Sequence, residues 1–196
     1  SGTAGGKRVQ ALGGAKNHMV VLPDADIDLA ADSAVSAAYG SAGERCMAIS
    51  VVVAVGEVAE PLVKAISDRI DNLKIGPGMQ PDSEMGPLIS EEHRSRVVDY
   101  INSGEAEGAT VVCDGRMHSR DQKGFYVGAT LLDNVTTDME VYRDEIFGPV
   151  LSVVRVQSFD DALDVIAENQ YGNGVAVFTR DGGLSLIHIS EPTRLD

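Results

Sequence analysis

The sequence predicts an α/β domain with a largely parallel sheet flanked by helices. First, short apolar runs of strand length alternate with longer amphipathic patterns along most of the chain, as is typical of βαβ units with right-handed connections. Second, Ile49–Val55 is an uninterrupted apolar run, which is expected of a strand buried on both faces. Third, 196 residues are enough for one sizeable core.

The first half of the chain carries the patterns of three strands and two helices. Pro23 and the aspartates after it form a turn and a helix start, with acidic side chains where the helix dipole favours them. Asp28, Asp32 and Ser36 then recur every four residues, which predicts a helix with one polar face. The expected strands are 8–12, 18–22 and 49–55, and the expected helices are 27–39 and 58–73.

The second half continues the alternation. Ser90 and Ser158 each stand directly before a helical pattern, where a serine hydroxyl can accept a hydrogen bond from an amide of the first turn. The expected helices are 91–103 and 159–167, the expected strands are 109–113, 125–132, 151–156 and 175–178, and 115–124 is expected to be a polar loop.

Cys46 lies between a small-residue helix ending in Gly40 and Gly43 and the strand that begins at residue 49. A cysteine at such a turn can point into a cleft. The positive charge of Arg45 beside it would favour the thiolate, the nucleophilic form. The competing interpretation is a packed thiol, because free cysteine is among the most buried residue types. Local features leave both interpretations open.

Composition excludes several classes of function. Sixteen basic residues against thirty acidic ones give a net charge of −14, which disfavours binding to nucleic acid and to anionic membranes. Only two cysteines are present, which fits a reducing compartment better than a disulfide framework. The histidines are scattered and no Cys-x-x-Cys pair occurs, so no metal site is expected. Cys113 is expected to be an inert thiol in a strand, and a Cys46–His18 protease pair has no local support.

Three motifs resemble those of the aldehyde dehydrogenase superfamily. They are Ala11-Leu-Gly-Gly14, Gly43-Glu-Arg-Cys46 and, far downstream, Asp144-Glu-Ile-Phe-Gly-Pro-Val150. The longer strings from Gln10 to His18 and from Tyr39 to Val51 resemble one branch, the CoA-acylating methylmalonate-semialdehyde dehydrogenases. The resemblance covers residues 1 to 183.

The resemblance implies a set of site residues. Cys46 matches the nucleophile that attacks an aldehyde, after which hydride passes to NAD and a thioacyl enzyme remains. Glu145 matches the glutamate that holds the nicotinamide ribose hydroxyls, Phe147 the residue that supports the ring, and Gly13 part of the wall of the nicotinamide site. From the residues alone, a surface carboxylate paired with Arg143 is the favoured interpretation of Glu145, and core packing of Phe147 is equally compatible with its implied role.

One position departs from the hydrolytic members of the superfamily. Their glutamate before Leu-Gly-Gly acts as general base for water, whereas this chain has Ala11, which cannot take a proton. Hydrolysis of the thioester should then be slow, and coenzyme A is expected as cosubstrate. Arg45 is a candidate for binding the carboxylate of a malonate or methylmalonate semialdehyde. It could instead tune Cys46 or pair with Glu44.

The resemblance also implies a domain organisation. Residues 1–14 are expected to be the C-terminal edge of the NAD-binding domain and 15–183 the catalytic domain, whereas 184–196 do not follow the family pattern. The family's asparagine oxyanion donor and dinucleotide-binding turn are expected upstream of Ser1. The complete enzyme is expected to be a homo-oligomer, a tetramer, located in the cytoplasm of a bacterium or the mitochondrion of a eukaryote.

Three functional hypotheses follow. The first is NAD-dependent, CoA-acylating oxidation of a small semialdehyde by the parent enzyme. The second is a general aldehyde dehydrogenase that produces a carboxylic acid, which Ala11 disfavours. The third is an inactive fragment with exposed apolar surface and only an interaction role.

Overall fold

The computed structural model describes residues 5–6, 13–117 and 123–184. In this part of the chain, strands form one sheet in the order β3-β4-β5-β2-β1-β6. All neighbours are parallel except β3 and β4, which confirms the predicted fold class. The strands are β1 (Asn17–Val21), β2 (Ile49–Val55), β3 (Thr110–Cys113), β4 (Thr130–Asp133), β5 (Val150–Val156) and β6 (Val175–Phe178).

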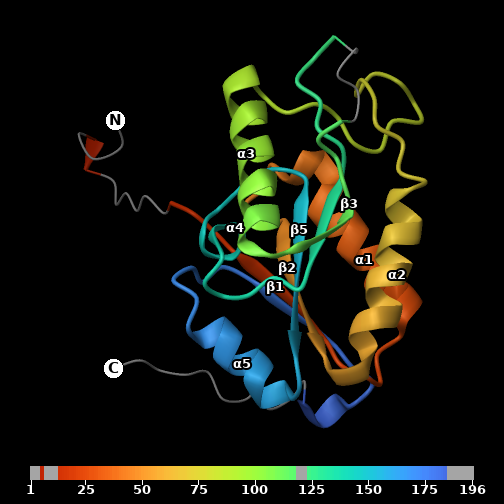
Figure 1. Cartoon of the computed structure of the whole chain (residues 1–196), viewed down its shortest axis with the longest axis vertical. Helices are drawn as coiled ribbons and strands as arrows, with labels where there is room; N and C mark the ends of the chain where they lie inside the picture. Colours follow the sequence, from red (N-terminus) through yellow and green to blue (C-terminus); the bar gives the residue numbers. More distant parts are fainter. Residues whose placement is uncertain (1–4, 7–12, 118–122, 185–196) are drawn as a thin grey trace.

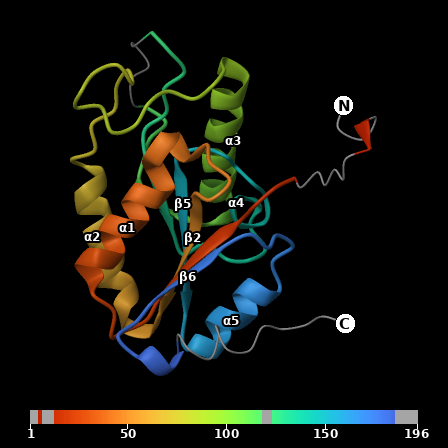
Figure 2. The same ribbon diagram turned by 180° about the vertical axis from the view of Figure 1, so that it is seen from behind.

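Helices cover both faces of the sheet. The helices α1 (Ile27–Tyr39) and α2 (Ala59–Ile70) pack against each other on one face. On the other face lie α3 (Glu91–Glu107), α4 (Glu140–Arg143) and α5 (Phe159–Ala167) (Figures 1 and 2). A search of the described residues finds no helix with the length and apolar character needed to cross a membrane.

The core is centred on β2. Val52 pairs with Met19 of β1 on one side and with Val153 of β5 on the other, and all three are buried. Leu62 and Ile66, on the inner face of α2, are also fully buried. The run Ile49–Val55 is therefore apolar throughout because both of its faces are covered by helices.

Helix starts follow from the capping residues. The Asp26 side chain accepts a hydrogen bond from Leu29 N–H at the start of α1. Ser90 accepts one from His93 N–H and begins α3. Ser158 begins α5 and forms a reciprocal capping box with Asp161. The structure thus confirms the starts predicted at both serines.

Some predicted boundaries were wrong. The predicted strand 125–132 is only Thr130–Asp133, because the backbone at Phe125 forms an isolated bridge with Leu88 instead of entering the sheet. Helix α2 ends at Ile70 rather than at residue 73, and α3 continues to Glu107, where Gly108 ends it at φ 110°. The short helix α4 was not predicted. The predicted strand 8–12 and the segment 185–196 lie outside the described residues.

A left-handed turn joins α1 to the segment that carries Cys46. Ser41, Ala42 and Gly43 have φ angles of 54°, 53° and 71°. Residues with a Cβ adopt this conformation at a cost of about 1–2 kcal/mol each. The helix ends at Tyr39, as expected, and a strained turn, Gly40–Gly43, follows it, with two residues between the turn and the cysteine.

Candidate active site

The candidate site lies at one edge of the sheet, where loops enter the parallel strands. The loops before β1, β2, β5 and β6 all meet at this edge because the four strands run in the same direction. The loop before β2 carries Cys46, and the loop before β5 carries Glu145 and Phe147. These are the amino ends of the strands, whereas ligands in open α/β sheets generally bind at the carboxyl ends.

Cys46 is exposed in a turn directly before β2. Ala48 N–H donates to the Arg45 carbonyl at 3.0 Å, which closes a four-residue turn with Cys46 at its second position. The Cys46 carbonyl accepts hydrogen bonds from the side-chain amides of Asn17, at 2.9 Å, and Asn173, at 2.6 Å. The carbonyl is thus held by the fold while the side chain is open to solvent.

Glu145 lies in the same recess as Cys46 and Phe147. It is half-buried, and its Oε1 accepts a hydrogen bond from Ala15 N–H at 3.1 Å. This bond fixes the carboxylate on the loop before β1 and leaves Oε2 as an acceptor for hydroxyl groups. The surface pairing with Arg143 that the sequence left open is not among the ion pairs of the described residues.

Lys16 lies beneath this loop and is 2% exposed. Its Nζ donates to the Val141 carbonyl at 2.7 Å and to the Asp144 carbonyl at 2.6 Å. Burial lowers the pKa of Lys16 to about 7, against the opposing influence of Asp144 and Glu145. Lys16 therefore ties the strand that holds Asn17 to the residues just before Glu145.

Phe147 is 39% exposed and has a φ of 55°. The buried His93 stabilises this conformation, since its Nε2 lies 2.7 Å from the Phe147 carbonyl. Arg96 donates to His93 Nδ1 at 2.8 Å, so Nε2 carries the proton and donates to Phe147. A cavity of about 440 Å³ opens beside this group and is lined by Glu44, Ile89, Ser90, Glu92, His93, Arg96 and Phe147.

The cysteine loop and the Phe147 loop touch at two glycines. A Cβ added at Gly43 would overlap the carbonyl of Gly148, and one added at Gly148 would lie 2.6 Å from a methyl of Val97. Both positions therefore require glycine for close packing, in addition to the positive φ of Gly43. This contact brings the two halves of the recess together.

The Arg45 side chain is bound to the end of helix α1, whereas the Cys46 side chain is open to solvent. Its guanidinium donates to the carbonyls of Ser36 and Ala37, both at 3.1 Å, near the C-terminal end of α1. The Ser36 carbonyl also accepts from Gly40 N–H, so Arg45 adds a second donor there, and its guanidinium places a cation near the negative end of the helix dipole. Glu44 instead accepts a hydrogen bond from Ile89 N–H. Carboxylate binding by Arg45 stays a prediction, and it would require the guanidinium to leave these carbonyls.

Gly13 is exposed and lies two residues before Ala15, the donor to Glu145. Gly14 has a φ of 89°, and a Cβ there would collide with the ring of Tyr171. Ala11 lies outside the described residues.

The alternative roles for cysteine and histidine have little geometric support. His18 is 1% exposed, its Nε2 lies 3.1 Å from Tyr142 Oη, and burial lowers its pKa to about 4. Cys113 is half-buried, its Sγ lies 3.2 Å from Ser67 Oγ, and burial raises its pKa. A thiol with a raised pKa is a weak nucleophile at neutral pH. Among the residues that the structure describes, no three His, Cys, Asp or Glu side chains are grouped to hold a metal ion.

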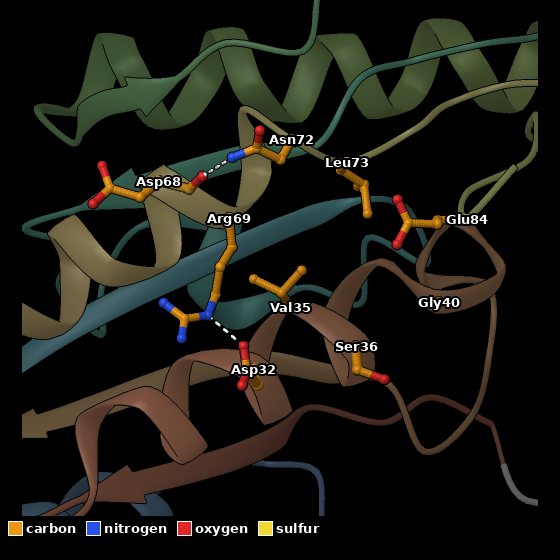
Figure 3. A pocket seen from close by; sticks show the side chains of 9 residues that line it. All are labelled: Asp32, Val35, Ser36, Gly40, Asp68, Arg69, Asn72, Leu73 and Glu84. Carbon is orange, nitrogen blue, oxygen red and sulfur yellow. Dashed lines mark hydrogen bonds and ion pairs between the residues drawn. The ribbon is translucent and has the colours of Figure 1, made fainter. Parts of the chain in front are cut away.

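A larger cavity of about 450 Å³ lies elsewhere, between α1 and α2 (Figure 3). Arg69 spans it and pairs with Asp32 at 2.5 Å, and Asn72 donates to the Asp68 carbonyl at 2.8 Å. Neither Cys46 nor Glu145 lines this cavity. Asp32 and Asp68 are in ion pairs and Glu84 accepts a hydrogen bond from Lys74 N–H, and no cysteine of the described residues lines the cavity, so it supplies no thiol nucleophile.

Sequence reasoning missed Lys16, Asn17, His93 and Asn173 as parts of the site. Lys16 and Asn17 stand next to the Gly-Gly motif, and a buried strand that opens with a lysine and an asparagine was a signal that could have been used. His93 and Asn173 come from distant segments and carry no such signal.

An exposed thiol, a fixed carboxylate and a half-exposed aromatic ring lie together at one sheet edge around a shallow recess of about 10 Å³, an arrangement that suits covalent chemistry at its open mouth. The model of the aldehyde dehydrogenase family matches residues 1–189. The chain belongs to the aldehyde dehydrogenase family. It is similar to a malonate-semialdehyde dehydrogenase of Halalkalibacterium halodurans, at 52% identity over 90% of this chain.

Solved structures agree with this assignment. The crystal structure of methylmalonate-semialdehyde dehydrogenase from Oceanimonas doudoroffii is 49% identical over 96% of this chain, with a TM-score of 0.91. A structure from Sinorhizobium meliloti 1021 complexed with NAD is 46% identical over 96% of the chain, also with a TM-score of 0.91. The chain spans 36% of the H. halodurans relative and 39% of each of the two crystallised chains.

Proposed function

We propose that this chain supplies the nucleophile and part of the cofactor site of an NAD-dependent, CoA-acylating semialdehyde dehydrogenase. The observation that carries the proposal is the exposed Cys46 thiol in the same recess as Glu145 and Phe147. The names of the relatives, malonate- and methylmalonate-semialdehyde dehydrogenase, support the substrate class. We further propose that residues 1–14 belong to the edge of a cofactor domain, that 15–183 form the catalytic domain, and that the complete enzyme is a homo-oligomer, in the cytoplasm of a bacterium or the mitochondrion of a eukaryote.

The residues at the sheet edge fit a nicotinamide dinucleotide. Glu145 Oε2 is an acceptor for the ribose hydroxyls, and the exposed ring of Phe147 can support a flat heterocycle. When bound, NAD supplies the hydride acceptor for the oxidation. Ala15 N–H fixes the orientation of the Glu145 carboxylate, and His93 fixes the backbone that carries Phe147.

Cys46 performs the covalent step in this proposal. Its thiolate adds to the aldehyde carbon to give a thiohemiacetal, and loss of hydride leaves an acyl group bound to Sγ as a thioester. The thiol of coenzyme A then attacks the thioester carbon, takes over the acyl group and releases the Cys46 thiolate. Ala11, in place of a general base, leaves water without activation, so transfer to the thiol is favoured over hydrolysis.

Selective alkylation tests the role of Cys46. Iodoacetamide at neutral pH should label Cys46 at least about tenfold faster than Cys113, because the first thiol is exposed and the second is half-buried and has a raised pKa. Peptide mass spectrometry gives the two rates. Faster labelling of Cys113 in the folded chain would contradict the proposal.

Replacement of Ala11 tests the acyl acceptor. In an active, full-length enzyme that contains this chain, Ala11→Glu should raise NADH formation in the absence of CoA, because a carboxylate there can activate water. Ala11→Gln is the matched control, since its amide has a similar size and cannot act as a base. Equal CoA-independent rates for the two variants would refute the assigned role of position 11.

A further inference from the structure

The Cys46 carbonyl is the meeting point of two amide side chains from different parts of the chain. Asn17, the first residue of β1, donates to it at 2.9 Å, and Asn173, in the loop before β6, donates at 2.6 Å. A carbonyl oxygen has two lone pairs, and the two amides can use both. We call Asn17 and Asn173 the amide clamp.

Asn17 donates hydrogen bonds to two carbonyls of the turn that carries Cys46. Its Nδ2 also donates to the Ala48 carbonyl at 2.8 Å, and its side chain is 2% exposed. Because both neighbours of Nδ2 are carbonyl acceptors, the orientation of the amide is fixed. Asn17 Oδ1 is buried and has no hydrogen-bond partner among the described residues. Such an unsatisfied group is costly, so this arrangement needs a compensating reason.

The geometry separates the carbonyl of Cys46 from its thiol. The carbonyl points inward to the buried Asn17, whereas the cysteine side chain is exposed. The Cys46 main chain is therefore fixed while its side chain stays accessible.

We propose that Asn17 and Asn173 are positioning residues that fix the Cys46 peptide group so that the thiol faces the recess. The proposal deepens the assigned role of Cys46 and rests on it. Asn173 offers the better test because it is exposed and its replacement leaves the buried Asn17 in place. Its side chain touches neither Glu145 nor Phe147 in the hydrogen bonds of the described residues.

The experiment measures iodoacetamide labelling of Cys46 in the 196-residue chain, with Cys113 as an internal monitor of unfolding. Asn173→Ala should slow the labelling of Cys46 by between about twofold and tenfold, the range expected for loss of one hydrogen bond. Asn173→Gln retains a donor and should recover most of the rate. Asn72→Ala is the matched control, because Asn72 also donates to a main-chain carbonyl but lies just past the C-terminal end of α2, away from the recess.

Each outcome decides the proposal. A slower rate in Asn173→Ala, recovered in Asn173→Gln and unchanged in Asn72→Ala, supports the amide clamp. Equal rates in the wild type and Asn173→Ala, or no recovery in Asn173→Gln, overturn it. If Asn173→Ala accelerates labelling of Cys113, the isosteric Asn173→Leu replaces it as the donor-free variant. Poor selectivity for Cys46 already in the wild-type chain would instead count against the proposed function.

Discussion

Lys16 is the buried charge that most affects the candidate site at the residue scale. A protonated lysine in the interior is unfavourable unless its three donors find acceptors. The Val141 and Asp144 carbonyls provide two. A neutral amine has two N–H groups and can keep both bonds, so loss of the proton removes the charge without breaking the contacts.

The pKa of Lys16 predicts how stability depends on pH. Burial lowers this pKa from 10.5 to about 7, so between pH 7 and 10 the unfolded chain holds a proton that the folded chain has lost. The free energy of unfolding should therefore rise with pH in this window, by up to about 1.4 kcal/mol per pH unit. Urea unfolding at several pH values should show this slope in the wild type and its loss in Lys16→Met.

Lys64→Met is the control for Lys16→Met. Lys64 is exposed and pairs with Asp68 on the surface of α2, so its replacement should leave the slope unchanged. Equal slopes for the wild type and Lys16→Met would contradict the assigned pKa.

Ser41 is a second position where a single side chain should measurably lower the free energy of unfolding. It is exposed and has a φ of 54°, so its Cβ adds strain without adding packing. Ser41→Gly should raise the free energy of unfolding by about 0.5–1 kcal/mol. Ser33→Gly, in the interior of α1, should instead lower it by a similar amount. Thermal unfolding monitored by circular dichroism compares them, and destabilisation by Ser41→Gly would rule out the strain.

At the scale of secondary-structure elements, the capping residues that begin the helices make a testable contribution to stability. In α5, the Ser158 side chain accepts from Asp161 N–H at 3.1 Å, and the Asp161 carboxylate accepts from Ser158 N–H at 2.9 Å. Ser158→Ala should cost about 1 kcal/mol of unfolding free energy, because an amide of the first turn loses its acceptor.

Ser158→Asp is the matching replacement for Ser158→Ala. A carboxylate can accept the same hydrogen bond, so this variant should retain most of the stability in urea unfolding. An alanine variant as stable as the wild type would show that the capping box contributes nothing.

The elements also show what the sequence could predict. Strand Ile49–Val55 and helix Ile27–Tyr39 match their predicted bounds because apolar periodicity and a side-chain cap define them locally. The predicted start of β4 was wrong because Phe125 is apolar but pairs with Leu88 instead of entering the sheet. The left-handed turn before Cys46 depends on the close approach of Gly148, a contact between distant segments that no local pattern encodes.

The same distinction applies to the candidate site. Cys46, Glu145 and Phe147 could be named from motifs, and the structure places all three in one recess. The guanidinium of Arg45 is bound at the end of α1, which the motif did not reveal. Asn173 and His93 act through backbone carbonyls more than fifty residues away, so only the folded chain identifies them.

For the whole molecule, a net charge of −14 predicts a response to salt. Repulsion among the acidic groups opposes the compact state, and added ions screen it. Raising NaCl from 0.02 to 0.2 M should increase the melting temperature by about 2–5 °C. A double variant, Asp71→Asn with Glu168→Gln, should show a smaller increase, because both residues place negative charge at helix C-terminal ends. A melting temperature that falls with salt would contradict the prediction.

The contact between Gly43 and the Gly148 carbonyl has a mechanical consequence. With no side chain between them, neither backbone has room to advance toward the other. A displacement of Phe147 that carried Gly148 toward Gly43 would therefore press on the segment that leads into Cys46. A cofactor that contacts Phe147 would in this way alter the position of the Cys46 sulfur, which attacks the aldehyde.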